Sequence, residues 1–349
     1  MTPVYQNSSH GYLRDILDQP HALEETLDGL NHCSGLGDIP TRLADGEFHR
    51  ILLTGMGSSY HALHPLFLQL IRSGNTPVMI ETSELIHHAC GLIKPNTLLV
   101  VASQSGRSVE IVRLIEQVKK QAPLIALTNS PNSPLALNAD QVVLTQAGTE
   151  STVSCKTYQT ALMALAWMGD VLCGANIQSD LQDLSCASEA VSRYLTRWEQ
   201  YVGDLMSLLK DVRHLFLVGR GSSLAAVGTG GLIAKESAHV HAEGMSSAAF
   251  RHGPLEMVTA DTMVVVFGGN AKTRALNRQL ADDVIRAGGK SVLVVEDELP
   301  GAFHLPATPE SARPILEILP VEMMTLAFAE LQGREAGTFK LGLKVTVVE

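Results

Sequence analysis

The chain has 349 residues, 45% of them hydrophobic and 18% charged, which is typical of a globular protein and long enough for two domains. Its formal net charge at pH 7 is −10 and it has no lysine- or arginine-rich run, so the electrostatic attraction that supports nucleic-acid binding is missing. No stretch approaches 18 uninterrupted apolar residues, and no basic segment followed by an apolar one opens the chain, so we expect no membrane partner and a cytoplasmic location.

The cysteines and histidines do not have the spacing of a disulfide framework or a metal site. Five cysteines are an odd and scattered number, and we expect reduced, mostly buried thiols. Of the thirteen histidines, His87 and His88 are adjacent and so point apart, while His239 and His241 lack a carboxylate at a familiar ligand spacing. The sequence therefore predicts no metal ion.

The first predicted element is helical. The segment "YLRDILDQPHALEETLDGL" at 12–30 reads as part of an N-terminal helical arm that covers residues 1–34. An apolar run and a G-x-G-S-S motif follow at 51–63, "ILLTGMGSSYHAL". The same pattern returns at 215–227, "LFLVGRGSSLAAV", with the glycines 164 positions apart. The chain therefore contains an internal duplication.

Two further pairs of segments extend the duplication. "LLVVASQSGRS" at 98–108 matches "MVVVFGGNAKT" at 263–273, and "PLIALTN" at 123–129 matches "KSVLVVE" at 290–296. Short apolar runs that alternate with amphipathic helical stretches indicate βαβ units and parallel sheets. We expect an α/β fold with two tandem doubly wound, flavodoxin-like αβα domains at 35–180 and 195–335.

Helical segments complete this domain plan. The helical pattern at 155–173 is expected to close the first domain, and the segment 183–210 to bridge to the second. Residues 336–349 are left as a C-terminal tail.

Small residues follow several of the predicted strands. In open α/β sheets, ligands bind beyond the carboxyl ends of the strands. Loops of serine and glycine that open a helix offer N–H groups, hydroxyls and the positive end of the helix dipole, which together suit a phosphate. The alternative is that these residues only make tight turns with serine caps. For "SQSGRS" we favour ligand binding by Ser103, Gln104, Ser105 and Ser108.

Nucleotide cofactors are a weaker alternative for the same loops. "GMGSSYHA" and "GRGSSLAA" both lack the third glycine of the dinucleotide fingerprint, and the G-x-x-x-x-G-K-[ST] pattern is absent from the chain. We therefore expect no organic cofactor.

Several blocks together resemble the double sugar-isomerase (SIS) family, and in particular the isomerase half of glucosamine-6-phosphate synthases. They are "GMGSSYHA", "SQSGRS", "GTESTVSCKTYQTAL", "GRGSS", "KESAHVHAEGMSSAAFRHGPLEMV" and the ending "GLKVTVVE". The similarity runs from about residue 10 to the C-terminus. It implies that the two α/β domains are SIS domains and that the tail 336–349 lies over the active site.

The resemblance also implies a set of site residues. Glu236 matches the carboxylate that moves a proton between C1 and C2 of the sugar, and Lys344 matches the lysine associated with the open-chain carbonyl. His252 matches the histidine that opens the sugar ring from the neighbouring subunit, which implies a homodimer. The phosphate of a hexose 6-phosphate is assigned to Ser59, Ser103, Gln104, Ser105 and Ser108, and the sugar itself to Gly57, Ser58, Glu150 and Ser154.

The chemistry of these residue types agrees with such roles. Aldose–ketose interconversion needs one base over adjacent carbons, and a carboxylate with a raised pKa can accept and return that proton. Histidine titrates near neutrality, as ring opening requires, and an amine can bond to or capture a carbonyl. Taken singly, a helix glutamate, a histidine before Gly-Pro and a lysine near the C-terminus are as well explained by solvated positions.

Departures from the family pattern shape the expected activity. The synthases carry a glutaminase domain before the isomerase half, whereas here Thr2 follows Met1, and we expect glutamine not to be the nitrogen source. Arg107 stands where the family usually has an acidic residue. Because glutamine is not expected to supply nitrogen, we expect the reverse direction, a deaminase that converts glucosamine 6-phosphate to fructose 6-phosphate and ammonia. The alternatives are a phosphosugar isomerase or fructosamine-phosphate deglycase, and a non-catalytic phosphosugar sensor.

Overall fold

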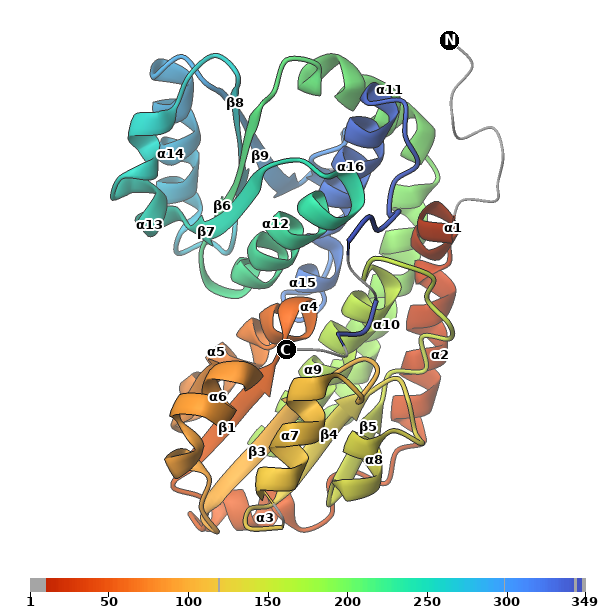
Figure 1. Cartoon of the computed structure of the whole chain (residues 1–349), viewed down its shortest axis with the longest axis vertical. Coiled ribbons are helices and arrows are strands. Elements are labelled where there is room, and N and C mark those ends of the chain that lie inside the picture. Colours follow the sequence, from red (N-terminus) through yellow and green to blue (C-terminus); the bar gives the residue numbers. More distant parts are fainter. Residues whose placement is uncertain (1–10, 119, 298, 342–343, 347–349) are drawn as a thin grey trace. The chain divides into compact units, whose positions relative to one another are not determined.

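The structure is a computed structural model that describes residues 11–118, 120–297, 299–341 and 344–346 (Figure 1). Contacts divide the described residues into two compact units. The sheet-A unit contains residues 21–149, 156–185 and 341–346, and the sheet-B unit contains residues 11–20, 150–155 and 186–340. The N-terminal arm and the C-terminal tail each contribute to both units.

The sheet-A unit is built on five parallel strands in the order β2-β1-β3-β4-β5. Its central strand β3, with the sequence TLLVVA, is buried along its whole length. Continuous apolar runs of this kind are typical of parallel strands, because helices cover both faces of the sheet. The strands are β1 (Arg50–Gly55), β2 (Pro77–Glu81), β3 (Thr97–Ala102), β4 (Leu124–Thr128) and β5 (Gln141–Leu144).

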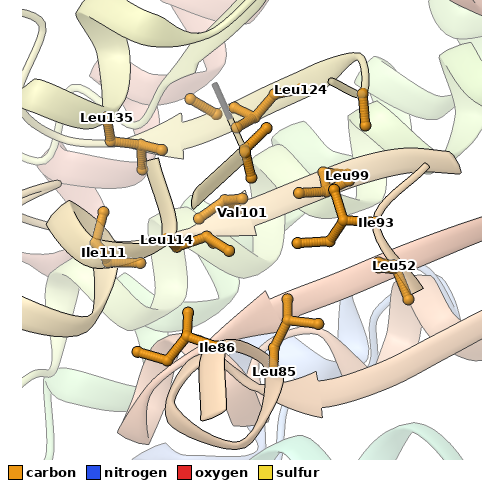
Figure 2. Packing of buried hydrophobic residues seen from close by; sticks show 13 residues of the cluster. Leu52, Leu85, Ile86, Ile93, Leu99, Val101, Ile111, Leu114, Leu124 and Leu135 are labelled. Carbon is orange, nitrogen blue, oxygen red and sulfur yellow. The ribbon is translucent and has the colours of Figure 1, made fainter. Parts of the chain in front are cut away.

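Helices cover both faces of sheet A. On one face, α6, α7 and α8 enclose a core that includes Leu99, Val101 and Leu114 (Figure 2). On the other face lies α9, which contacts β4 and also packs against α3 and α5. The helices are α2 (Gln19–Asn31), α3 (Ile39–Ala44), α4 (Gly57–His61), α5 (His64–Arg72), α6 (Thr82–His88), η2 (Cys90–Leu92), α7 (Val109–Val118), α8 (Pro134–Asn138) and α9 (Lys156–Cys173).

Sheet B repeats this arrangement. Its five parallel strands have the order β10-β9-β8-β6-β7, which is the order of sheet A when the strands are matched along the duplication. The strand β8 is again buried throughout. The strands are β6 (His214–Gly219), β7 (Ala242–Ser246), β8 (Thr262–Phe267), β9 (Lys290–Glu296) and β10 (His304–Leu305).

The helices of the sheet-B unit also form two layers. On one face, α13 and α14 pack on β6 and β8, with the Phe216 and Phe250 rings 5.2 Å apart. On the other face, α12 packs on β6 and β7, and α16 packs on α12 and α11. The helices are α1 (Gly11–Leu17), α10 (Ile177–Leu195, which begins in the sheet-A unit), α11 (Trp198–Leu209), η3 (Gly221–Ser223), α12 (Leu224–Ala238), α13 (Ser247–Arg251), η4 (Pro254–Met257), α14 (Arg274–Arg286), α15 (Arg313–Leu316) and α16 (Leu319–Leu331).

The expected fold class is confirmed, since two parallel five-stranded sheets with flanking helices follow N-terminal helices. The helices of the segment 183–210 lie mostly within the sheet-B unit, because α11 packs against α16 of that unit. No helix in the described part of the chain has the length and apolar character needed to cross a membrane.

The expectation of mostly buried cysteines is wrong. All five thiols are free, but only Cys155 is buried, while Cys90 and Cys186 are exposed. Cys90 begins the short 3-10 helix η2, and Cys186 lies on α10. The side chains of both residues face away from a core.

Candidate functional site

Two serine-containing loops leave sheet A side by side. Gly55, the last residue of β1, pairs in register with Ala102, the last residue of β3. The strand order reverses between β1 and β3, and this is the position at which ligands bind in doubly wound sheets. A Cβ at Gly55 would lie 2.8 Å from the Ala102 carbonyl oxygen, so only glycine allows the two strand ends to approach this closely.

The first loop, after β1, contains two serine hydroxyls that form no hydrogen bond with the described residues. Gly57 has a φ of +53°, which turns the chain from β1 into the short helix α4. Ser58 is buried and Ser59 half-buried. Neither hydroxyl has a hydrogen-bond partner among the described residues.

The second loop, residues 103–108, is held by hydrogen bonds within itself. The Gly106 N–H donates to the Ser103 hydroxyl at 3.1 Å, and the Arg107 N–H donates to the Ser105 hydroxyl at 3.3 Å. Gly106 has a φ of +59°, and a Cβ there would collide with the side chain of Ser133. These contacts hold the serine side chains in one arrangement above the start of α7.

Neighbouring strands anchor the same loop from below. The Gln104 carbonyl oxygen accepts hydrogen bonds from the Asn129 N–H at 3.0 Å and the Thr128 hydroxyl at 3.1 Å. The Ser108 hydroxyl has no hydrogen-bond partner among the described residues and stands directly before α7. The edge of sheet A therefore combines free hydroxyls with a helix N-terminus, an arrangement suited to an anion.

The C-terminal tail reaches the same helix. The Thr346 carbonyl oxygen accepts a hydrogen bond from the N–H of Val109, the first residue of α7, at 3.2 Å. Lys344 is only two residues from this contact and is half-buried. Two residues span at most about 7 Å, so the backbone of Lys344 lies close to the serine loop.

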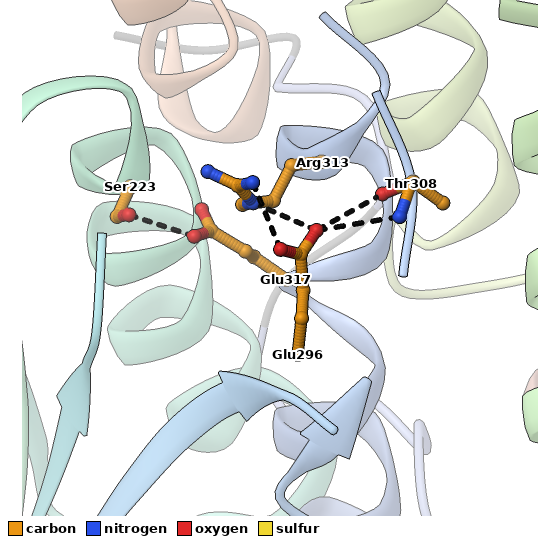
Figure 3. Close-up of polar contacts among 5 residues, drawn as sticks. All are labelled: Ser223, Glu296, Thr308, Arg313 and Glu317. Atoms are coloured by element: carbon orange, nitrogen blue, oxygen red, sulfur yellow. Dashed lines mark hydrogen bonds and ion pairs between the residues drawn. The ribbon is translucent and has the colours of Figure 1, made fainter. Parts of the chain in front are cut away.

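The second serine of the matching loop of sheet B is bound by the protein itself. Ser223 corresponds to Ser59 in the duplication, and Gly221 has a φ of +63°, close to that of Gly57. The Ser223 hydroxyl donates to a carboxylate oxygen of Glu317 at 2.7 Å (Figure 3). Burial raises the pKa of Glu317 to about 7, against smaller lowering effects of Ser223 and Arg313.

An ion pair between Arg313 and Glu296 lies beside Glu317. The Arg313 guanidinium binds both carboxylate oxygens of Glu296, with each N to O distance 2.9 Å. The N–H and the hydroxyl of Thr308 approach the same carboxylate at 3.4 Å (Figure 3). The loop after β6 therefore differs from the loop after β1 at its second serine, because Ser223 already has a protein partner.

Glu236 is a half-buried carboxyl near the end of α12. Burial raises its pKa to about 6, and neighbouring Lys235 lowers it by less. A carboxyl of this pKa can both accept and return a proton near neutrality.

The other predicted residues of the sheet-B unit have different surroundings. His252 is exposed and ends α13, and Gly253 beyond it has a φ of +134°. Glu150 is buried, and its carboxylate accepts the Cys155 N–H at 2.9 Å, so it shapes the 150–155 turn. Ser154 is half-buried in that turn.

Sequence reasoning missed two buried acids. Burial raises the pKa of Glu322 on α16 to about 8, and its carboxyl accepts a hydrogen bond from the Gln19 amide at 2.7 Å. Glu317 is the second. The available signal was a glutamate within each of two mostly apolar stretches, "PILEIL" and "PVEMMTLAFA".

Comparisons with known proteins agree with this fold. The model of the SIS domain family matches residues 47–168 and 208–328. A glutamine–fructose-6-phosphate aminotransferase (isomerizing) from Pyrococcus horikoshii is 28% identical over 337 residues, which is 93% of this chain and 55% of the relative. The chain thus spans about half the length of the curated relatives that it matches.

Solved structures with low sequence identity share the fold. The C-terminal domain of glucosamine-fructose-6-phosphate aminotransferase from Francisella tularensis superposes with a TM-score of 0.82 at 23% identity, covering 93% of this chain and 96% of that one. The glucosamine-6-phosphate deaminase from Thermotoga maritima superposes with a TM-score of 0.77 at 17% identity, covering 97% and 100%. With the family model matched over both sheets, this chain belongs to the SIS domain family and carries two SIS domains in tandem.

Proposed function

We propose that the protein is a phosphosugar enzyme that converts glucosamine 6-phosphate to fructose 6-phosphate and ammonia. The observation that carries the proposal is the difference between two matched loops. Within the part of the chain that the structure describes, the hydroxyls of Ser59 and Ser108 have no partner, whereas the Ser223 hydroxyl is bound to Glu317. The free hydroxyl of Ser59, set against the occupied hydroxyl of the matched Ser223, supports a ligand at the sheet-A loop rather than a purely structural role there.

Phosphate binding falls to the sheet-A unit. The hydroxyls of Ser59 and Ser108 can donate to phosphate oxygens, and the start of α7 contributes the positive end of its dipole. Ser103, Gln104 and Ser105 shape the loop through their own hydrogen bonds. Relatives named for action on fructose 6-phosphate support a hexose 6-phosphate as the compound bound.

Proton transfer falls to Glu236 of the sheet-B unit. In the open-chain amino sugar, its carboxylate removes the proton from C2 and returns it to C1, which converts the aldehyde and amine into a ketose imine. Water then adds to the imine carbon, and ammonia leaves. His252 is proposed to protonate the ring oxygen as the bond between C1 and that oxygen breaks and the C1 hydroxyl loses its proton to water. Lys344 is proposed to donate a hydrogen bond to the oxygen of the carbonyl that forms.

A coupled assay tests the proposal. Purified protein is incubated with glucosamine 6-phosphate, and ammonia and fructose 6-phosphate are both measured. We expect equal amounts of the two products, and a Glu236→Gln variant that is folded but slower by about 100-fold or more. Wild-type turnover no higher than that of the variant would rule the proposal out.

Arg107 favours a second candidate of the same class. Its guanidinium is exposed beside the serine loop, and the hydrogen bond that it makes to a described residue is a weak one to the Asn132 carbonyl at 3.5 Å. A cation at this place suits a substrate with a second anionic group, such as a fructosamine phosphate derived from an amino acid. Release of a free amino acid without ammonia would support this deglycase.

A non-catalytic sensor is less well supported. Such a protein needs the phosphate loop but no half-buried Glu236 with a raised pKa. Saturable binding of hexose 6-phosphates without turnover of any of them would favour the sensor.

A further inference from the structure

A cavity lies in the sheet-B unit, away from the residues discussed so far. Its volume is about 420 Å³, which is within the range of small-molecule sites. It is bounded by the end of α10 and the start of α11 on one side, and by the segment from Asp297 to Ala307 on the other. Neither Glu236, His252 nor the loop 220–223 lines it.

Two arginines face this cavity without a partner. Arg193 lies in the last turn of α10, and Arg197 directly precedes α11. Both are exposed, and within the described residues neither guanidinium makes a hydrogen bond or an ion pair. In a chain of formal net charge −10, two unpaired guanidinium groups beside one cavity form a local positive site.

Two other titratable side chains that line the cavity, Asp297 and His304, do not pair with the two arginines. The Asp297 carboxylate accepts the Leu299 N–H at 3.0 Å and lies within ion-pair distance of neither arginine. His304 is half-buried, and its Nδ1 donates to the Leu299 carbonyl at 3.1 Å, which leaves Nε2 free to contact a ligand. Among the described residues that line the cavity, the two guanidinium groups therefore outnumber the one carboxylate.

Aromatic rings form the inner wall of the cavity. Tyr194 and Tyr201 are buried, with ring centroids 4.9 Å apart. The Tyr194 hydroxyl donates to the Ala302 carbonyl at 2.6 Å, and the Tyr201 ring packs against the Tyr194 ring. These contacts fix the segment after β9 against the helices, so the wall is preformed. Pro300 and Pro306 add an apolar rim.

We propose that this cavity binds a small organic phosphate, with the phosphate held by Arg193 and Arg197 and a ring-shaped body placed against the tyrosine and proline wall. Guanidinium groups match phosphate oxygens with paired N–H donors, which lysine cannot do. A preformed wall lowers the entropic cost of binding.

Calorimetry on the full-length protein tests the proposal, with adenosine 5′-monophosphate, phenyl phosphate, inorganic phosphate and adenosine as probes. The titrations are made in a Ser59→Ala/Ser108→Ala background, so that binding at the sheet-A loops does not contribute. We expect at least one organic phosphate to bind once per chain, more tightly than inorganic phosphate, and adenosine not to bind. Affinity should fall with added salt.

Variants locate the binding. Arg193→Ala and Arg197→Ala should each weaken it about tenfold, and the double variant should abolish it, with unchanged thermal unfolding because both side chains are exposed. Arg278→Ala, an exposed arginine of α14 outside the cavity, is the matched control and should bind normally. If no organic phosphate binds below about 1 mM, or if the double variant binds as tightly as the control, the proposal is wrong. Because binding is measured directly, the result does not depend on turnover of glucosamine 6-phosphate.

Discussion

Burial separates the acidities of three glutamates in the sheet-B unit. The pKa is raised to about 6 for Glu236, to about 7 for Glu317 and to about 8 for Glu322. Glu317 and Glu322 are fully buried and bonded to Ser223 and Gln19. Glu236 is only half-buried, so it alone combines a raised pKa with access from solvent.

The pH dependence of activity should follow Glu236. The proposed base is the carboxylate, which is present above its pKa of about 6, so kcat/KM should fall as the pH is lowered through 6. Glu243→Gln, an exposed glutamate of β7, is the control and should keep the same acidic limb. A wild-type profile that stays level down to pH 5 would contradict this role.

The matched serines should respond differently to the same substitution. Ser59→Ala removes a proposed phosphate donor, and we expect KM to rise by about tenfold with unchanged stability. Ser223→Ala leaves the buried Glu317 carboxyl without its donor, and the free energy of unfolding should fall by about 1–3 kcal/mol with KM unchanged. Steady-state kinetics and urea unfolding on both variants check this. Equal effects of the two substitutions on KM would mean that the loops are not functionally distinct.

Glu322 should make stability depend on pH. Its folded-state pKa of about 8 lies above its unfolded value of about 4.5, so the folded protein binds the extra proton and stability falls as the pH rises between these values. Glu322→Gln removes this loss and keeps a partner for Gln19. We expect the variant to gain stability relative to wild type as the pH rises from 5 to 8, by a few kcal/mol in unfolding experiments. A difference that does not change with pH would show that Glu322 is ionised in the folded protein.

At the scale of elements, backbone geometry fixes the phosphate loop. The carboxyl ends of β1 and β3 are in register, and the loop 103–108 is tied to β4 through the Gln104 carbonyl. The free hydroxyls of Ser59 and Ser108 therefore project from a rigid support. Phosphate binding by this loop would therefore depend on the backbone geometry that Gly106 allows as well as on the serine hydroxyls.

Gly106→Ala should disturb this support. The new Cβ would combine a positive φ with a collision against Ser133, so we expect a loss of about 2–4 kcal/mol in unfolding free energy and weaker phosphate binding. The matched control is Gly74→Ala, where φ is +85° and no atom lies within 4 Å of the new Cβ. That variant should lose only about 1–2 kcal/mol and bind phosphate normally. Similar binding by both variants would argue against a fixed loop.

At the scale of the whole molecule, the two sheets share one strand order but differ in the loops at the carboxyl ends of their strands. The duplication gave each sheet a G-x-G-S-S loop after its first strand. Among the described residues Ser59 keeps a free hydroxyl, whereas the hydroxyl of the matched Ser223 is bound by Glu317. Duplicated frameworks can thus divide binding and structural roles between equivalent positions.

Subunit mixing tests whether His252 acts across a dimer. His252 is exposed, as a group that serves a neighbouring subunit must be. Inactive His252→Ala and Glu236→Gln chains should, when co-expressed, recover about a quarter of wild-type activity. About half of the dimers then contain one chain of each variant, and each mixed dimer has one complete site out of two. Each variant expressed alone is the control. No recovery in purified mixed dimers would show that each chain uses its own histidine.

The sequence by itself determined the duplication, the parallel sheets and the position of the serine loops. These follow from apolar runs, glycine spacing and helical periodicity, which are local patterns. It also led to the SIS family, which the match over both sheets confirms.

Only the tertiary structure decided which of the matched serines, Ser59 or Ser223, keeps a hydroxyl free for a ligand. Glu317 is 94 positions from Ser223, and Thr346 is far along the chain from Val109, so no local pattern relates them. The exposure of the cysteines and the acidities of Glu236 and Glu322 likewise depend on what packs around each side chain. Such contacts form between distant segments, and burial, which sets both hydrogen bonding and pKa, exists only once the chain has folded.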